Sequence, residues 1–463
     1  MEMQKWKILP AMLAAAMFAC APCAAQEAMG EAAVVEEKIE FVEDAALAKL
    51  LIAARAENPQ IAAAKQRTEA AKASLDAAAA QMGPDLFGGL GAMWQKDGVV
   101  MDTGIPGIGS INAVGSHTYA AAIGLSQVIY AGGSLTAQKE AERLALGATE
   151  AQELRTEQSV ENATRRAYYS FRDAQAQRRV AEEALRLAEE HLGRAEKLFA
   201  AGVVAKSDVL RAKVSVSESE LTLIRAKSAE ANAMTALRRA VGADPAEVEL
   251  AEPDAFAKQL LDDPAGVKEL EPFVSRMPEG DNVEAAFGAR AELKAYALLS
   301  KQAEKLARAE QGKLLPQILG TVAYVTAEDN FFPTDNGEPV AAIGLYWNLY
   351  DSGEARAKTR EARAKAKELL FQLDDMKNSI RMEVVQAEQN MASALSRFEV
   401  ASRQTEQARE DYRIAVRRYE ENVGTSLEES DSRLALVNAL TETATALYDI
   451  KTAEADLIYA IGK

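Results

Sequence analysis

The chain contains one sequence unit twice, and this internal repeat constrains the fold more than any other feature. The pentapeptide AAIGL occurs at Ala121–Leu125 and returns 220 positions later at Ala341–Leu345, and the alignment then runs without a gap to Gly242 and Gly462. Upstream of the pentapeptide the offset becomes 232, because the first copy has a longer loop. Repetition on this scale indicates one structural unit built twice. We therefore predict two equivalent halves, each with a helix, a strand hairpin and long helices.

The N-terminus is typical of a secretory signal peptide. Lys5 and Lys7 precede an apolar run over residues 8–19 and then a group of small residues, so we expect cleavage after Ala25. The expected division of the chain is a signal peptide at 1–25, a first structural repeat at 26–242, an equatorial linker region at 243–289 and a second structural repeat at 290–463.

The only two cysteines, Cys20 and Cys23, precede the expected cleavage site. Their spacing is compatible with a redox or metal-binding pair, but residues of a discarded signal explain them better, and lipidation of Cys20 is a third alternative. No later segment has about 18 consecutive apolar residues, so no transmembrane helix is predicted. An exported chain of this kind either remains soluble or enters a membrane by strands.

The net charge of −17 excludes one class of partner. A nucleic-acid surface needs clustered Lys and Arg to neutralise phosphates, so we expect no nucleic acid as a partner. An acidic chain is compatible with a well-solvated surface or with a pore that prefers cations.

Two segments predict unusually long helices. Leu135–Phe199 and Ala355–Tyr419 contain no proline and hardly a glycine, and each could extend roughly 100 Å as a helix. Alanine recurs every seven residues in both, a period that predicts a left-handed supercoil with close backbone approach. These alanines are Ala167, Ala174, Ala181, Ala188 and Ala195 in the first copy and Ala387, Ala394, Ala401, Ala408 and Ala415 in the second.

An ordinary two-stranded coiled coil is the simpler interpretation of this periodicity. However, the pattern breaks around Gly202 and Gly424 and then resumes as further helix. We therefore predict two antiparallel helical hairpins with their tips at these two glycines.

The pentapeptide stretches predict strands. Residues of Ala121–Tyr130 and Ala341–Tyr350 alternate between apolar and small or polar types, and their expected partners are Leu86–Gln95 and Gln317–Thr326. Such a length suits a tilted membrane strand, with Ile123, Leu125, Ile343 and Leu345 facing lipid and Gly124 and Gly344 facing a pore. Aromatic residues near the strand ends suit a membrane–water interface, although they could also cap a small soluble sheet.

This combination resembles the outer membrane efflux protein (TolC) family, from about Asn58 to Gly462. The motifs that carry the resemblance are NP at Asn58, LPQ at Leu315–Gln317, the turns YAGG at Tyr130 and YDSG at Tyr350, and the tip sequences GVVAKSDVL at Gly202 and NVGTSLEESD at Asn422. The resemblance implies a mainly α fold with a membrane β-barrel. It also implies a homotrimer, in which four strands per subunit join a 12-stranded barrel and the helical hairpins form an α-barrel tunnel. Four strands cannot close a membrane barrel alone, which also calls for several copies.

The function implied is an outer membrane channel-tunnel of a tripartite efflux or type I secretion system in a Gram-negative bacterium. Its partners would be a periplasmic adaptor protein, an inner-membrane transporter and outer membrane lipid. By the same resemblance the hairpin tips meet the adaptor, through Gly202, Val203, Val204, Ser207 and Asp208 in the first copy and Val423, Gly424, Thr425 and Ser426 in the second. By the same resemblance, the acidic, proline-containing segment after residue 242 would form the equatorial collar.

Two acids follow the second tip. Glu428 and Asp431 are three residues apart, hence on one helix face, and they match the place where family members carry acids around the closed periplasmic entrance. In a trimer they would form a cation-preferring gate. The alternative is that both are solvated surface residues. The first copy has Asp208 and Arg211 at these places, so only the second copy supplies two acids.

An enzyme is not predicted. His117 and His191 belong to no recognisable catalytic or metal-binding constellation, and no cofactor or metal site is expected. The second hypothesis is a soluble periplasmic coiled-coil scaffold. The cargo, whether drug, metal ion or protein, is not specified by any motif.

Overall fold

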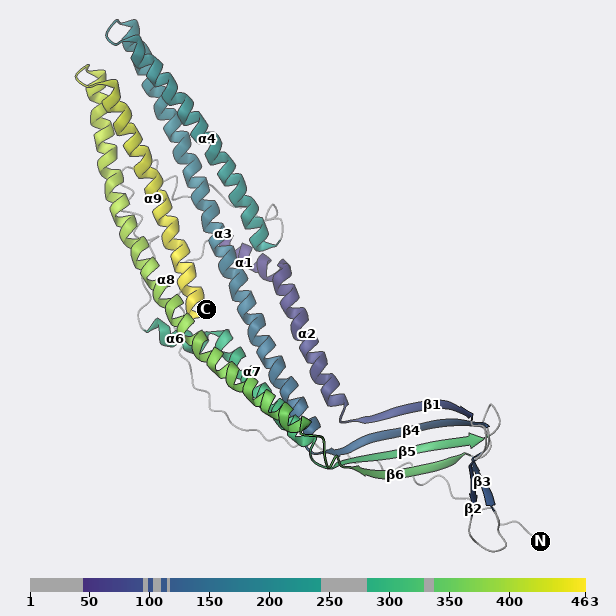
Figure 1. The fold of residues 1–463 in the computed structure, drawn as a ribbon. Coiled ribbons are helices and arrows are strands. Elements are labelled where there is room, and N and C mark those ends of the chain that lie inside the picture. The colour runs from purple at the N-terminus through teal and green to yellow at the C-terminus, as the bar shows by residue number, and fades with distance from the viewer. Residues whose placement is uncertain (1–44, 95–98, 103–109, 115–116, 243–280, 329–336) are drawn as a thin grey trace. The chain divides into compact units, whose positions relative to one another are not determined.

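The computed structural model describes residues 45–94, 99–102, 110–114, 117–242, 281–328 and 337–463, all within one compact unit that spans Asp44–Lys463 (Figure 1). The predicted signal peptide, both cysteines and most of the predicted linker lie outside the described residues.

The helices repeat as the sequence predicts. In the first half they are α1 (Ala45–Glu57), α2 (Pro59–Ala80), α3 (Ser134–Ala200) and α4 (Lys206–Val241), and in the second half α6 (Asn282–Ala289), α7 (Ala291–Gly312), α8 (Glu354–Glu420) and α9 (Ser426–Ile461). The pair α3 and α8 has 67 residues each, the pair α4 and α9 has 36, and the pair α2 and α7 has 22. Their first residues keep the offsets of 220 and 232 found in the sequence. None of the described helices has a stretch long and apolar enough to cross a membrane.

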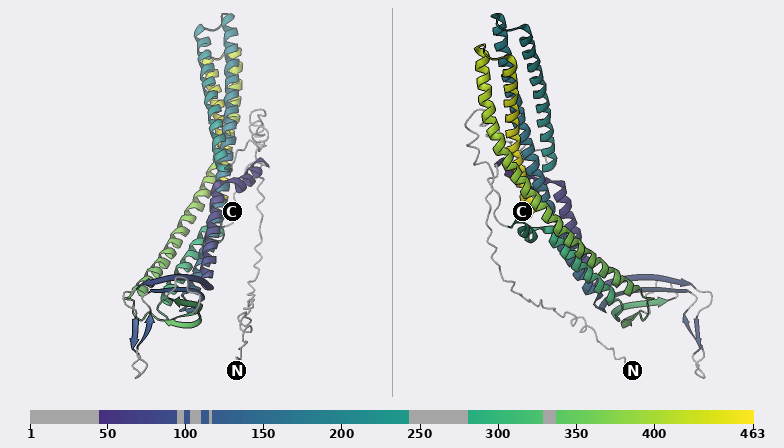
Figure 2. Two further views of the ribbon diagram at one scale, coloured as in Figure 1. Left: turned by 90° about the vertical axis from the view of Figure 1, so that its right-hand side faces the viewer. Right: turned by 60° about the vertical axis from the view of Figure 1, so that its left-hand side comes forward.

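The long helices pair as antiparallel hairpins, α3 with α4 and α8 with α9, and the two hairpins run side by side in both further views (Figure 2). Helix α3 also contacts α2, α7 and α9, so it joins the two halves. The heptad alanines pack into this core, since Ala181, Ala188, Ala394 and Ala401 are all buried. Two hairpins, rather than one two-stranded coiled coil, are therefore confirmed.

The two tips use different residues for the same turn. Gly202 has φ of 74° in the first hairpin, whereas the left-handed position of the second is Asn422, with φ of 57°. Gly424 lies in the same loop, between the end of α8 and the start of α9, as predicted for the tip, but it does not have positive φ. Asparagine tolerates this conformation better than other side chains, which is why the second hairpin can turn without a glycine.

Four antiparallel strands form one sheet in the order β1, β4, β5, β6. Their bounds are β1 (Pro84–Trp94), β4 (His117–Ala131), β5 (Gln317–Glu328) and β6 (Glu338–Tyr346). The longer loop of the first copy carries an unpredicted ribbon of β2 (Val99–Asp102) and β3 (Ser110–Val114). Strand β6 ends four residues before the predicted Tyr350, because Asp351 binds the backbone N–H groups of Gly353 and Ala355 and begins α8 there.

The register places the apolar residues on one face of the sheet. Leu125 pairs with Leu86 and with Val322, and Ile123 pairs with Tyr324. Paired residues of antiparallel strands share a face, so these side chains form a continuous apolar surface. All five are exposed in the single chain.

Each half closes on itself through an equivalent junction. Asn58 caps α2 by accepting the N–H of Gln60, and its amide donates to the carbonyl of Ala240 at 2.8 Å. In the second half Arg290 replaces Asn58, and its Nε donates to the carbonyl of Ala460 at 2.7 Å. The NP motif therefore marks the place where the first short helix meets the end of its hairpin.

Candidate functional site at the hairpin tips

The predicted adaptor-contact residues lie at the tips and are mostly accessible. Gly202, Val203, Ser207, Val423 and Thr425 are exposed, while Val204, Asp208 and Gly424 are half-buried. Ser426 is buried, so it is not available for an adaptor in this conformation. Thr425 accepts the N–H of Glu428 at 3.2 Å and thereby caps α9.

The two predicted gate acids are both exposed on α9. The carboxylate of Glu428 lies 3.6 Å from the guanidinium of Arg418 on α8. Two exposed acids one helical turn apart can influence ions near the tip, and their role in a gate remains a prediction.

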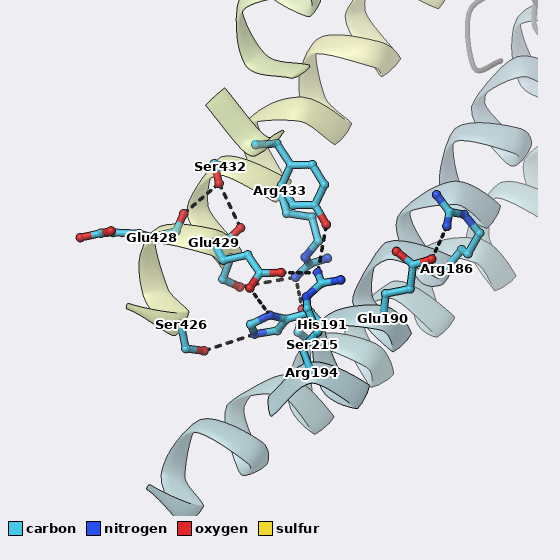
Figure 3. A network of polar contacts seen from close by, with 12 residues as sticks. Arg186, Glu190, His191, Arg194, Ser215, Ser426, Glu428, Glu429, Ser432 and Arg433 are labelled. Carbon is cyan, nitrogen blue, oxygen red and sulfur yellow. Dashed lines mark hydrogen bonds and ion pairs between the residues drawn. The ribbon is translucent and has the colours of Figure 1, made fainter. Parts of the chain in front are cut away.

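Glu429, one of the two residues between them in sequence, belongs to a buried polar network. Glu429 has no exposed surface, and it points from α9 towards α3 of the other hairpin (Figure 3). One carboxylate oxygen lies 3.0 Å from Nδ1 of His191, and the other accepts from Arg194. Nε2 of His191 lies 3.2 Å from the hydroxyl of Ser426, also on α9. A single carboxylate thus joins the two hairpins near their tips.

Further groups from α4 and α8 complete the network. Arg433 of α9 donates to Ser215 of α4, and Arg194 lies 3.4 Å from the hydroxyl of Tyr412 on α8. The ring of Tyr419 packs 5.5 Å from the ring of His191. All four long helices therefore contribute to one site.

The electrostatics favour an ionised Glu429. Burial alone would raise its pKa, but hydrogen bonds and charges from His191 and Arg194 outweigh burial and hold the pKa of Glu429 below its ordinary value. Burial would likewise lower the pKa of Arg194, and the bond to Glu429 raises that pKa instead. Burial raises the pKa of Tyr412 and lowers that of Arg433.

Sequence reasoning missed this site, although the repeat contained a signal for it. Glu429 aligns with Val209, which packs against Ala195 and Ala212 in the core of the first hairpin. An acid at a position that is apolar in the other copy needs a partner, because burying an unpaired charge is very costly. His191, taken from the sequence as an isolated residue of a charged helix, is that partner.

The predicted lipid-facing residues share the apolar face of the sheet. Ile123, Leu125, Ile343 and Leu345 are 59%, 49%, 79% and 67% exposed. Gly124 lies on the opposite face, where an added Cβ would be 2.6 Å from the Cβ of Ala323. A side chain added at Gly124 would therefore collide with Ala323, whereas one added at Gly344 would have open space.

Among the residues that the structure describes, no group of three or more His, Cys, Asp or Glu side chains could hold a metal ion. The chemistry available at the tip is that of charged and hydrogen-bonding groups between helices.

The sequence profile of outer membrane efflux proteins matches residues 50–243 and 283–463. The chain belongs to the outer membrane efflux protein family. The matched residues cover both repeats, so the family resemblance found in the motifs is confirmed over nearly the whole chain. No protein with a curated function matches the sequence significantly.

Solved structures show the same fold at low sequence identity. The outer-membrane channel OprN is 19% identical over 90% of this chain and 90% of its own length, with a TM-score of 0.74. CusC is 17% identical over 90% of this chain and 92% of its own, with a TM-score of 0.76. VceC, an outer membrane protein of Vibrio cholerae, is 18% identical over 90% and 96%, with a TM-score of 0.73.

Membership of the outer membrane efflux protein family confirms the main functional prediction, an outer membrane efflux channel with long periplasmic helices. The mainly helical fold with a small set of antiparallel strands is confirmed as well. The alternative of a soluble scaffold is not favoured. The family and these structural neighbours are channels rather than enzymes.

Proposed function

We propose that three copies of this chain form one channel through the outer membrane, which receives its cargo from a periplasmic adaptor and an inner-membrane transporter. The observation that carries this proposal is the sheet, which ends in β1 on one side and β6 on the other. Unpaired strand edges are not tolerated in lipid, so both edges need partners. The first and last of four antiparallel strands run in opposite directions. Strand β6 of one copy can therefore continue the antiparallel pattern with β1 of the next, and a ring of copies closes.

The helices support the same assembly. Helix α4 presents large apolar side chains to solvent at Leu210, Val214, Leu221 and Ile224, and the exposed Val203 lies in the tip loop just before it. Their spacing of three, four or seven residues places them along one stripe of the helix. A stripe of this length on a single chain is typical of a surface that packs against another helix. The number of copies in the ring, three, is taken from the family resemblance.

In this proposal the tips form the periplasmic entrance. The exposed tip residues contact the adaptor, and Glu428 and Asp431 contribute a ring of carboxylates that favours cations. The Glu429 network ties the two hairpins of a subunit together next to this ring.

Fractionation and conductance test the channel. The protein extracted from outer membranes should migrate as a trimer that dissociates on heating, and it should conduct ions in planar bilayers. A monomer found only in the soluble periplasmic fraction would contradict the proposal.

The gate is tested separately on the same bilayers. Replacement of Glu428 and Asp431 by Gln and Asn should raise the conductance or reduce the preference for cations. Glu220→Gln, which removes an exposed acid on α4 away from the tip, is the matched control. If the double variant and the control behave alike, the two acids do not line the constriction.

A further inference from the structure

A basic cavity lies where the sheet meets the second long helix. Its volume is about 700 Å³, and it opens between the end of α7 and the first three turns of α8. The residues that matter for its chemistry are Gln311, Leu314, Ser352, Arg356, Arg360 and Arg363. The three arginines are spaced by four and three residues, so their guanidinium groups lie on one face of α8.

These arginines differ from the other cations nearby. Within the described part of the chain, no carboxylate lies within ion-pair distance of any of the three. In contrast, Lys358 and Lys365 on another face of α8 each lie 2.6 Å from a glutamate of the same helix. The chain as a whole carries a charge of −17, so three arginines without an ion-pair contact in one cavity are unusual for it, although the charge of Arg356 helps to lower the pKa of Asp351.

The nearest acids are already engaged. Asp351 accepts the N–H groups of Gly353 at 2.9 Å and Ala355 at 2.8 Å, and these backbone bonds lower its pKa. Asp351 also caps the N-terminus of α8, so the backbone N–H groups that it binds at that helix end are not free to bind another anion. Glu310 lies 2.6 Å from Lys313.

The cavity is at the level expected for the membrane surface. The indole of Trp347 donates to the carbonyl of Leu314 at 3.0 Å, and Leu314 lines the cavity. Trp347, Leu349 and Tyr350 are 52%, 79% and 83% exposed, just after the end of β6. Exposed Trp and Tyr at a strand end are typical of the zone of lipid headgroups.

We infer that Arg356, Arg360 and Arg363 form a binding site for the phosphate of an anionic phospholipid headgroup. This inference rests on the proposed function, because it needs the sheet to lie in a bilayer. Guanidinium groups bind phosphate oxygens through paired hydrogen bonds, and several on one face fit one phosphate better than separate lysines would. Leu314 in the cavity lining and the exposed Leu349 just after β6 are apolar side chains on which the acyl chains can lie.

The repeat provides an internal comparison. The positions equivalent to the three arginines in the first copy are Thr136, Glu140 and Arg143, and Glu140 is paired with Lys305. The first copy therefore lacks the cluster, and we expect one such site in each subunit.

The test uses Trp347 as the reporter. With Trp94→Phe, Trp347 is the only tryptophan outside the predicted signal peptide. Phosphatidylglycerol with brominated acyl chains, titrated into the detergent-solubilised trimer, should quench Trp347 saturably. The triple variant Arg356→Gln, Arg360→Gln, Arg363→Gln should weaken this binding about 100-fold, at about fivefold for each arginine. The control Lys358→Gln, Lys365→Gln should change it less than threefold, because those lysines are already paired.

Each other outcome overturns the inference in a recognisable way. Equal quenching of the triple variant and the control would show that the arginines do not bind lipid. Displacement of the lipid by millimolar inorganic phosphate would assign the site to a soluble phosphate instead. Loss of the trimer with unchanged lipid binding would make the arginines a contact between subunits. Failure of the proposed function is distinguished beforehand, since the unaltered protein would then form no conducting trimer.

Discussion

The buried carboxylate at the hairpin tips leads to a quantitative prediction. Glu429→Gln keeps the shape of the side chain but removes its charge, so Arg194 and His191 lose their anionic partner. Removing one member of a fully buried ion pair costs about 3–5 kcal/mol. The side chain of Arg194 is 18% exposed and can gain some water, so we expect a loss of about 2–3 kcal/mol.

This loss of stability should make the two hairpins separate more often near their tips. Amides of α3 and α9 that exchange through this local opening should exchange about 30- to 150-fold faster in the variant, at a factor of ten for each 1.36 kcal/mol. Hydrogen–deuterium exchange with mass spectrometry measures this directly. Glu428→Gln is the matched control, because the neighbouring carboxylate is exposed and should change the rates by less than threefold.

A second variant tests whether the unpaired buried charge causes the faster exchange. Glu429→Val with Arg194→Ile copies the residues that the repeat places at the equivalent positions, Val209 and Ile414. Replacing both members of a buried pair by apolar residues often costs little, so the double variant should exchange more slowly than Glu429→Gln. Equal exchange in Glu429→Gln and Glu428→Gln would refute the role assigned to Glu429.

Three further predictions concern stability. The folded pKa of Glu429 lies below its unfolded value of 4.5, so its contribution to stability is complete well above pH 4.5. This contribution should be lost as the pH falls through the lower folded pKa. In thermal unfolding, Glu429→Gln should therefore show a weaker dependence on acid than the unaltered protein. Gly132→Ala should lower the free energy of unfolding by more than about 2 kcal/mol, since φ is +62° and a Cβ would lie 2.1 Å from a backbone oxygen. Gly202→Ala, with φ of +74° and open space, should lower it by only about 1 kcal/mol in the same assay. Asn58→Ala removes a helix cap and the bond to Ala240, so it should lower the free energy of unfolding by about 2 kcal/mol in denaturant titrations.

The repeat made most of the helical architecture predictable. Two copies report on the same element, so the proline-free segments and heptad alanines of one copy support those of the other, and equivalent helices have equal lengths. The second tip was predicted at Gly424, which lies in the loop between α8 and α9, but the left-handed residue of that loop is Asn422, which aligns with Gly202. Equivalence was the more reliable guide there than local propensity.

The rest of the site could not be found from periodicity alone. A glutamate on a charged helix is normally on the surface, and a pattern within one helix does not reveal that a second hairpin covers it. Glu429 and His191 lie far apart in sequence and meet only because α3 contacts α9. The β2–β3 ribbon lies in the part of the loop by which the first copy is longer, so the second copy offered no equivalent residues for comparison.

Helix α9 is attached by polar contacts at both of its ends. Near its start, Glu429 binds α3, and at its end the carbonyl of Ala460 accepts from Arg290. Between these points its buried surface combines small residues such as Ala439 and Ala444 with large ones such as Leu440 and Ile450. The two attachments are 31 residues apart in sequence, or roughly 46 Å along the helix. Helix α9 is therefore held over roughly 46 Å by a polar attachment at each end and an apolar core between them, so release of Glu429 alone would free only the tip end of the helix.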